Sequence, residues 1–261
     1  MLFNKKLFRL AGLGLLLVFL LSAYNVKAAE GYYYQIKVYH LKDKAQEDVL
    51  DTYLKDAYVP ALHKMGIKNV GVFKSIETDT AKRIYVFVPF KSLKDLNDLD
   101  LKLYNATATD ANKAYIDANF KTPPYTRVET IVLSAFREML APAVPNLTAD
   151  KAERIYELRS YESATEKYYY NKVKMFNDGD EVGLFKRLGF NAVFYASVIA
   201  GSHMPNLMYM TTFNNKADRD KHWEAFSADA YWKELSGKPE YQNNVSHADI
   251  IFLHPAAYSD F

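Results

Sequence analysis

Residues 156–161, YELRSY, have a counterpart earlier in the chain, YQIKVY at residues 34–39. Both alternate polar side chains with aromatic or branched ones, which is the pattern of a half-buried β-strand. The similarity continues downstream, where FKRLGF at residues 185–190 aligns with LHKMGI at residues 62–67. The first pair is offset by 122 residues and the second by 123. The two offsets differ by only one residue, which indicates an internal repeat.

Each repeat continues from its opening strand with the same order of elements. A helix with apolar side chains at three- and four-residue steps comes next, and it is expected to end at Gly66 in the first repeat and at Gly189 in the second. Two strands, a second helical region and a last strand follow. The order β-α-β-β-α-β is that of a ferredoxin-like unit, in which both helices cover one face of an antiparallel sheet.

The two repeats are predicted to shelter each other within one chain. Residues 31–139 form the first repeat, residues 153–261 form the second, and the proline-containing residues 140–152 form the linker. A sheet whose helices cover one side leaves its other face bare, and two such sheets can cover each other. The expected architecture is α+β: two fused ferredoxin-like units in an intrachain pseudo-dimer, with a shared interior lined by the sheets.

Residues 1–28 are interpreted as a secretory signal peptide. A basic start precedes the uncharged run LAGLGLLLVFLL at residues 10–21, and small residues follow around Ala28. The run is shorter than the roughly 20 apolar residues that a membrane span needs. We expect an exported protein, periplasmic or secreted, without stable membrane insertion after cleavage. An uncleaved N-terminal anchor is the alternative.

Composition and motifs exclude several classes of function. Lys plus Arg number 33 and Asp plus Glu number 31, so the chain lacks the basic surplus of a nucleic-acid-binding protein. The chain has no cysteine, which excludes disulfides, thiolate zinc sites and cysteine nucleophiles. The part that follows the predicted signal peptide has no HExxH, Walker A or GxSxG motif. We predict no metal site and name no catalytic residue.

Alternation in the two opening strands predicts a polar interior. Side chains on one face of a strand recur at every second residue. The apolar set, which includes Ile36 and Leu158, is expected to lie under the helices, and the polar set is expected to point into the space between the sheets. The polar residues are Gln35, Lys37, Tyr39, Glu157, Arg159 and Tyr161.

Two interpretations of these polar residues remain open. In the first, the charges pair with one another and fix how the two halves dock, as buried ion pairs do at many interfaces. In the second, they supply the few polar groups of a ligand pocket. Arg159 and Lys37 would then bind a carboxylate or another anion, with Tyr39, Tyr161 and Glu157 beside them.

His203 is the histidine with the most suggestive position in the sequence. It lies in GSHMPN, residues 201–206, at the expected tip of a hairpin, where binding residues often collect. We therefore add it to the candidate ligand-binding residues, and the alternative is a solvated turn histidine. His203, His63 or His222 could in principle be an axial ligand of haem. No other cofactor is predicted.

The second repeat resembles the NIPSNAP family. The resemblance rests on RIYELRSY at residues 154–161, on FKRLGF at residues 185–190, on MYMTTF at residues 208–213 and on an aromatic second helix with Trp223 and Trp232. In the first repeat, Gln and Lys replace the Glu and Arg of the opening strand, and the second helical region lacks tryptophan. The first repeat therefore looks like a diverged copy.

The resemblance implies a dimeric α+β barrel, a fold that also occurs in monooxygenases, haem-degrading enzymes and plain ligand-binding proteins. It brings no agreed set of catalytic residues. The function expected is the binding of a small organic or anionic molecule in the cleft between the two sheets, without an established reaction. The alternative is a small-molecule oxygenase or a haem-handling enzyme. Further association into a homo-oligomer is compatible with this fold.

Overall fold

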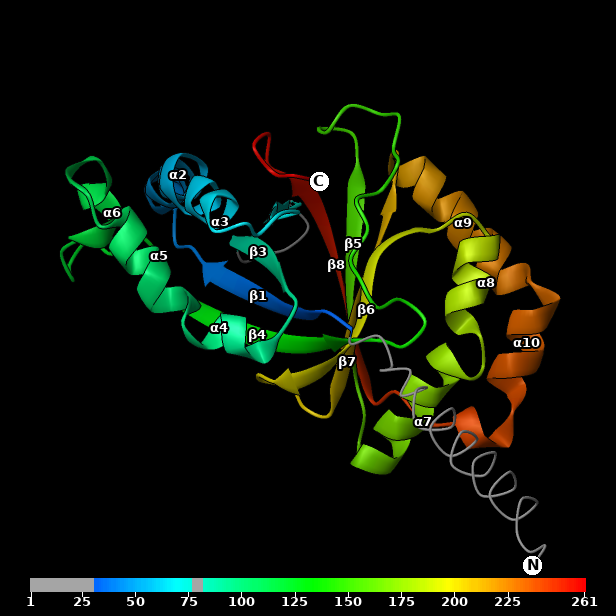
Figure 1. The fold of residues 1–261 in the computed structure, drawn as a ribbon. Coiled ribbons are helices and arrows are strands. Elements are labelled where there is room, and N and C mark those ends of the chain that lie inside the picture. Colours follow the sequence, from blue (N-terminus) through cyan, green and yellow to red (C-terminus); the bar gives the residue numbers. More distant parts are fainter. Residues whose placement is uncertain (1–30, 77–81) are drawn as a thin grey trace, which may run out of the picture. The chain divides into compact units, whose positions relative to one another are not determined.

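The computed structural model describes residues 31–76 and 82–261, in which the order β-α-β-β-α-β occurs twice (Figure 1). The elements of the first half are β1 (Tyr33–His40), α2 (Lys44–Tyr53), α3 (Val59–Lys64), β2 (Gly71–Ser75), β3 (Arg83–Phe90), α4 (Leu93–Asn97), α5 (Leu99–Thr107), α6 (Lys113–Ile116) and β4 (Arg127–Ala135). A π-helical turn, Leu54–Tyr58, joins α2 to α3.

The second half repeats this order after the segment 140–152, which contains neither helix nor strand. Its elements are β5 (Ile155–Glu162), α7 (Glu166–Asn177), α8 (Glu181–Arg187), β6 (Asn191–Ala200), β7 (Asn206–Phe213), α9 (Lys216–Ala228), α10 (Ala230–Gly237) and β8 (His247–Pro255). The predicted signal peptide, residues 1–28, lies outside the described residues. Among the helices that are described, none combines the length and apolar character needed to cross a membrane.

The first helical layer of each half ends in the same way. Gly66 and Gly189 have φ angles of +83° and +78°, in the left-handed region that glycine adopts without strain. The amide of Ile67 then donates to the carbonyl of Leu62, and the amide of Phe190 donates to that of Phe185, each at 3.0 Å. Both helices therefore end in the same capping motif, which confirms the predicted helix ends.

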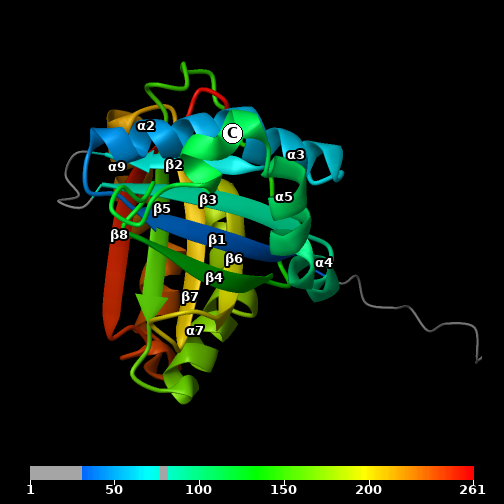
Figure 2. The same ribbon diagram turned by 90° about the vertical axis from the view of Figure 1, so that its left-hand side faces the viewer.

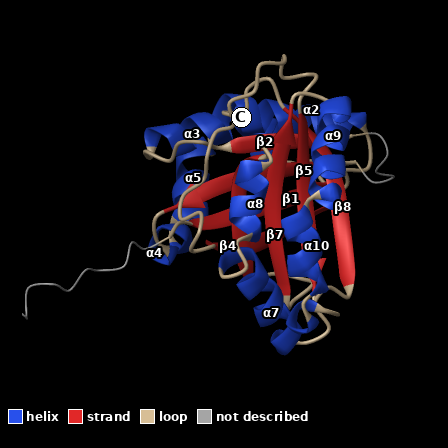
Figure 3. Cartoon of the chain, turned by 90° about the vertical axis from the view of Figure 1, so that its right-hand side faces the viewer, coloured by secondary structure: helices blue, strands red, loops and turns tan. Residues whose placement is uncertain are grey.

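All the strands of the described chain close into one barrel, in the order β1-β3-β2-β8-β5-β7-β6-β4. Neighbouring strands are antiparallel, and the two halves meet where β2 pairs with β8 and where β4 pairs with β6. Figure 2 shows α2, α3 and α5 in front of the first-half strands, and Figure 3 shows α8 and α10 in front of the second-half strands. The molecule is an α+β fold of two fused ferredoxin-like units in an intrachain dimeric α+β barrel.

Apolar side chains fill the interior of the barrel. One buried cluster draws on all eight strands and on no helix, and it includes Tyr34, Phe87, Tyr156 and Leu158, each at most 1 % exposed. The rings of Phe87 and Phe194 stack with their centroids 5.2 Å apart. An eight-stranded barrel encloses a space just wide enough for side chains to fill. The cleft that the sequence predicted between the sheets is therefore occupied by the protein's own side chains.

The predicted assignment of strand faces is wrong. The apolar set, with Ile36 and Leu158, lies inside the barrel, whereas the polar set faces the helices. Tyr39 packs with Leu50 of α2, and Glu157 accepts hydrogen bonds from α9. The enclosed interior has no water for charged groups, so it takes the apolar face. The helical layer has open edges, where long polar side chains reach solvent and one another.

Candidate functional site

A buried carboxylate, Glu157, organises a network of charged side chains between β5 and α9. Its side chain is fully buried. Arg159, two residues along β5, donates its Nε–H to Oε1 at 2.6 Å. From α9, Arg219 donates its Nε–H to Oε2 at 2.7 Å, and the indole of Trp223 donates to the same oxygen at 2.9 Å. Residues four apart on a helix share one face, so α9 presents both donors together.

The surroundings of Glu157 keep it ionised. Burial acts to raise its pKa, because a desolvated carboxylate loses its hydration. The hydrogen bond from Arg219 and the positive charges of Arg159 and Arg219 outweigh this effect, so the pKa lies below its ordinary value. A buried charge of this kind is tolerated only when it is paired and hydrogen-bonded.

The stability of the protein is therefore expected to decrease in acid through Glu157. Its pKa in the unfolded chain is about 4.3, and folding lowers it. The contribution of the carboxylate is fully present above the unfolded pKa and is lost as the pH falls through the lower folded pKa. Urea unfolding over a pH series should show this dependence in the wild type and a weaker one in Glu157→Gln. Equal slopes for the two proteins would contradict the assignment.

Arg159 extends the network from Glu157 to two tyrosines. Its NH1 donates to the hydroxyl of Tyr161 at 2.7 Å, and the hydroxyls of Tyr161 and Tyr209 lie 2.9 Å apart. The guanidinium carbon stands 3.7 Å from the ring centroid of Trp223, in a cation–π contact. Arg159 is 8 % exposed. Hydrogen bonds therefore hold the guanidinium within its own plane, and the ring of Trp223 packs against one of its faces.

The Arg159 guanidinium borders a cavity of about 270 Å³ between the sheet and the helices of the second half. The lining residues are aromatic or charged, with one serine: Arg159, Tyr161, Lys172, Glu181, Phe185, Tyr209, Trp223, Phe226, Ser227 and Trp232. Lys172 and Glu181 form a second buried ion pair, with Nζ and Oε2 2.9 Å apart. Burial raises the pKa of Glu181, and Lys172 offsets this only in part. The cavity therefore combines fixed cations with flat apolar walls.

Residues 156–260 match the family model NIPSNAP. We call this part of the chain the NIPSNAP domain. All the residues that line the 270 Å³ cavity lie within the matched range, as does Glu157. A search among curated proteins found no match.

The fold is also similar to that of solved proteins that match most of the chain. A candidate monooxygenase of Lactobacillus acidophilus NCFM has a TM-score of 0.53 and 12% identity, covering 87% of this chain and 94% of its own. A candidate monooxygenase of Fusobacterium nucleatum has a TM-score of 0.55 and 10% identity, with 87% and 93% covered. An anthrone oxidase-like protein has a TM-score of 0.53 and 10% identity, with 88% and 94% covered. At these identities the similarity establishes the fold and not the chemistry.

Two of the predicted site residues lie in the first half, away from the NIPSNAP domain's cavity. Lys37 forms an ion pair with Asp100 of α5, with Nζ and Oδ1 2.7 Å apart. Tyr39 is buried, and its ring meets that of Tyr125 edge-on at 5.3 Å. The structure therefore brings Glu157, Arg159 and Tyr161 together, but it does not bring Lys37 and Tyr39 to them.

The histidines named as candidate ligands or haem ligands also lie apart from the cavity of the NIPSNAP domain. His203 is exposed on the hairpin before β7, with its Nδ1 2.8 Å from Oε1 of Glu162. His63 pairs with Asp260 at 2.8 Å. His222 packs against Phe190, and its Nδ1 donates to the carbonyl of Asp218 at 2.7 Å. Haem binding stays a prediction, and its three candidate ligands do not share one cavity.

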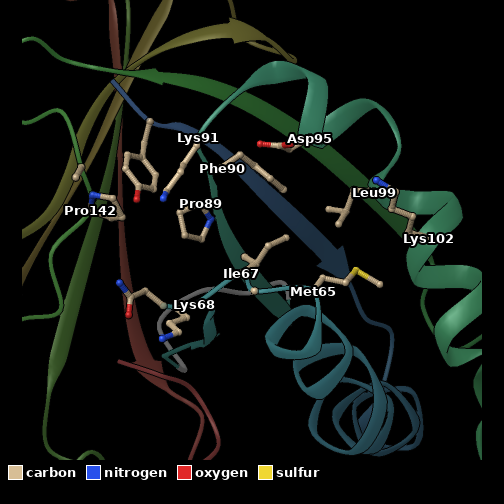
Figure 4. A pocket seen from close by; sticks show the side chains of 14 residues that line it. Met65, Ile67, Lys68, Pro89, Phe90, Lys91, Asp95, Leu99, Lys102 and Pro142 are labelled. Atoms are coloured by element: carbon tan, nitrogen blue, oxygen red, sulfur yellow. The ribbon is translucent and has the colours of Figure 1, made fainter. Parts of the chain in front are cut away.

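A larger cavity, of about 810 Å³, is lined by residues of the first half and of the linker and lies outside the NIPSNAP domain. Figure 4 shows Lys68, Lys91 and Lys102 around an apolar floor that includes Ile67 and Pro89. These lysines are all exposed, so water hydrates their ammonium groups. The smaller cavity holds a buried, oriented guanidinium, which is the feature that binding sites use to select a ligand. It is therefore the better candidate.

Sequence reasoning missed the α9 side of the network and the Lys172–Glu181 pair. Arg219 and Trp223 carried a local signal, because a cation and an indole four residues apart define one helix face. The strand that this face would cover was not visible in the sequence. Lys172 and Glu181 carried no such signal, since lysine and glutamate on helices are usually solvated.

Proposed function

We propose that the NIPSNAP domain binds a small organic anion with an aromatic or apolar body in the cavity beside Arg159. The observation that carries this proposal is the state of that guanidinium: it is 8 % exposed, held by Glu157 and Tyr161, and stacked on Trp223. A preorganised guanidinium suits the flat, charged oxygens of a carboxylate. The rings of Trp223 and Trp232 offer walls for an apolar body.

The charges around the cavity favour an anion over a cation. Three cationic side chains, of Arg159, Lys172 and Arg219, meet two carboxylates, of Glu157 and Glu181. A third carboxylate, Asp220, also contacts Arg219, but it is half exposed and is itself paired with a lysine at 2.6 Å. The local balance is therefore one positive charge. The volume of about 270 Å³ lies just below the roughly 300 Å³ at which typical ligand pockets begin, so the ligand is expected to be small.

Benzoate and its neutral isostere benzamide make a matched pair of probes for this proposal. We expect benzoate, measured by calorimetry and thermal shift, to bind and stabilise the wild type and benzamide to have little effect. Arg159→Lys replaces the planar guanidinium with an ammonium group, and Tyr161→Phe removes the hydroxyl that accepts a hydrogen bond from Arg159. Loss of one charge-assisted hydrogen bond is worth about 1.5–3 kcal/mol, so each variant should bind benzoate roughly 10- to 100-fold more weakly.

Lys91→Ala is the control for this experiment, because Lys91 lines the larger cavity of the first half. It should bind benzoate as the wild type does. A loss of binding in Lys91→Ala with full binding in Arg159→Lys would place the ligand in the other cavity and overturn the proposal. Far-UV circular dichroism and urea midpoints establish that each variant is folded before its affinity is compared.

An enzyme acting at the same cavity is the second candidate function. Glu181 is 2 % exposed, and burial raises its pKa, as is common for carboxyl groups at sites of proton transfer. The fold shared with the candidate monooxygenases gives oxygenation as the reaction class to test. An oxygen electrode distinguishes the two functions: a binding protein leaves the oxygen concentration unchanged when the anion is added, whereas an oxygenase consumes it.

A further inference from the structure

A second group of chemically active side chains lies at one mouth of the barrel. Glu162, His247 and Asp249 place one ligand atom each within 4.8 Å of one another. The hairpin between β6 and β7 adds His203, whose Nδ1 is 2.8 Å from Oε1 of Glu162. His247 Nε2 lies 3.2 Å from Oδ1 of Asp249. Two imidazoles and two carboxylates thus meet outside both cavities described above.

The barrel itself brings these side chains together. Glu162 is the last residue of β5 and pairs with His247, the first residue of β8. Asp249 is two residues further along β8 and therefore shares a face with His247. Glu162 lies on the same face of β5 as Leu158, whose side chain is inside the barrel. The four side chains therefore lie where the interior of the barrel opens to solvent. The register of β5 against β8 therefore fixes the positions of Glu162, His247 and Asp249.

Backbone contacts hold the fourth ligand in place. The amide of Ser163 donates to the carbonyl of Pro205 at 3.0 Å, which ties the hairpin of His203 to the end of β5. His203 itself has a φ of +64°, in the left-handed region that few side-chain-bearing residues adopt. On the other side, the amide of Ser246 donates to the carbonyl of Glu162 at 2.8 Å. The hairpin and the start of β8 are thus both anchored at the end of β5, beside Glu162.

We propose that Glu162, His203, His247 and Asp249 bind one divalent transition-metal ion, with Zn²⁺ as the best-suited metal. Imidazole nitrogen with carboxylate oxygen is a ligand set that zinc accepts, at about 2.0–2.2 Å from each atom. Two ligands of one ion are then up to about 4 Å apart, so the ligand atoms of Glu162, His247 and Asp249, within 4.8 Å of one another, need only small rotations. The Nδ1 of His203 already lies 2.8 Å from Oε1 of Glu162. Magnesium and calcium prefer an all-oxygen set, which the two imidazoles do not supply.

The exposure of the ligands gives the ion a way in. The side chains of His203 and His247 are each 60% exposed, that of Asp249 is 49% exposed, and that of Glu162 is 22% exposed. An ion can therefore reach the group from solvent without opening the barrel. Sequence reasoning predicted no metal site because it considered spacing along the chain, and Glu162 lies far from His247 in sequence although the two are paired in the sheet.

Titration of tag-free protein with Zn²⁺ by calorimetry, and with Co²⁺ by visible absorption, tests the proposal. The wild type should bind one ion per chain. Glu162→Gln and His247→Ala should each weaken binding at least tenfold, because a ligand to the metal is lost, and His203→Ala should do the same. His63→Ala is the matched control, since His63 is also exposed and paired with a carboxylate, Asp260. It should bind as the wild type does.

A second measurement uses only the wild type and so does not depend on how the variants fold. Paramagnetic Cu²⁺ added in small amounts should broaden the ring-proton NMR signals of His203 and His247 before that of His63. No binding at one ion per chain, binding that survives both Glu162→Gln and His247→Ala, or uniform broadening of all histidines would each overturn the proposal. Binding that survives His203→Ala alone would overturn the four-ligand site.

Discussion

Replacing Glu157 with alanine is expected to lower the free energy of unfolding by about 3–5 kcal/mol, the typical cost of removing one partner of a buried ion pair. The side chain is fully buried, and it accepts hydrogen bonds from Arg159, Arg219 and Trp223. Its removal would leave the guanidinium of Arg159 at 8 % exposure without a carboxylate. Urea denaturation, with the slope of the transition checked for constancy, measures the loss.

Asp220→Ala is the matched control for the Glu157 prediction. Asp220 contacts the same arginine, with Oδ1 3.0 Å from NH1 of Arg219, but its side chain is 51% exposed. Exposed ion pairs contribute about 0–1 kcal/mol, so this variant should stay close to the wild type. A double variant, Glu157→Leu with Arg159→Met, should recover part of the loss, because it removes the buried Arg159 charge together with its carboxylate and leaves Arg219 in contact with Asp220. Equal losses in Glu157→Ala and Asp220→Ala would contradict a buried network.

The order of elements was predictable from the sequence because local chemistry determines it. Glycine at the two helix ends and alternation in the strands are local signals, and both are confirmed. Which face of β5 lies inside the barrel was not predictable. Residues 155–160 are all buried, so both faces of this strand lie against protein. When neither face meets water, alternation separates the two sets of side chains but does not say which one lies in the barrel.

The candidate site was predictable only in part, for a related reason. Glu157, Arg159 and Tyr161 were found because they are close together on one strand. Their partner helix α9 is distant in the chain, and its contribution depends on the packing of that helix over β5 and not on a motif. The same holds at the barrel mouth, where strand pairing joins Glu162 to His247. In both places the chemistry is assembled by tertiary structure from residues that look ordinary alone.

Phe87→Ala should also destabilise the protein by about 3–5 kcal/mol, the usual range for an aromatic ring removed from a core. Phe87 is 1 % exposed inside the barrel, and its ring centroid lies 5.1 Å from that of Tyr34 and 5.9 Å from that of Phe261. The strands form a closed hydrogen-bonded barrel, so they cannot move inward freely to fill the space of the missing ring. The loss therefore includes the cost of a cavity as well as that of lost burial.

Phe120→Ala removes the same ring from a position that is 84% exposed, and it should change the stability by less than about 0.5 kcal/mol. Denaturant unfolding of the two variants side by side isolates the contribution of the interior. If Phe87→Ala cost no more than Phe120→Ala, the barrel would not be filled as described. A ligand site between the sheets would then again compete with the cavity beside Arg159, whereas a large difference restricts ligand binding to the helical side of the sheet.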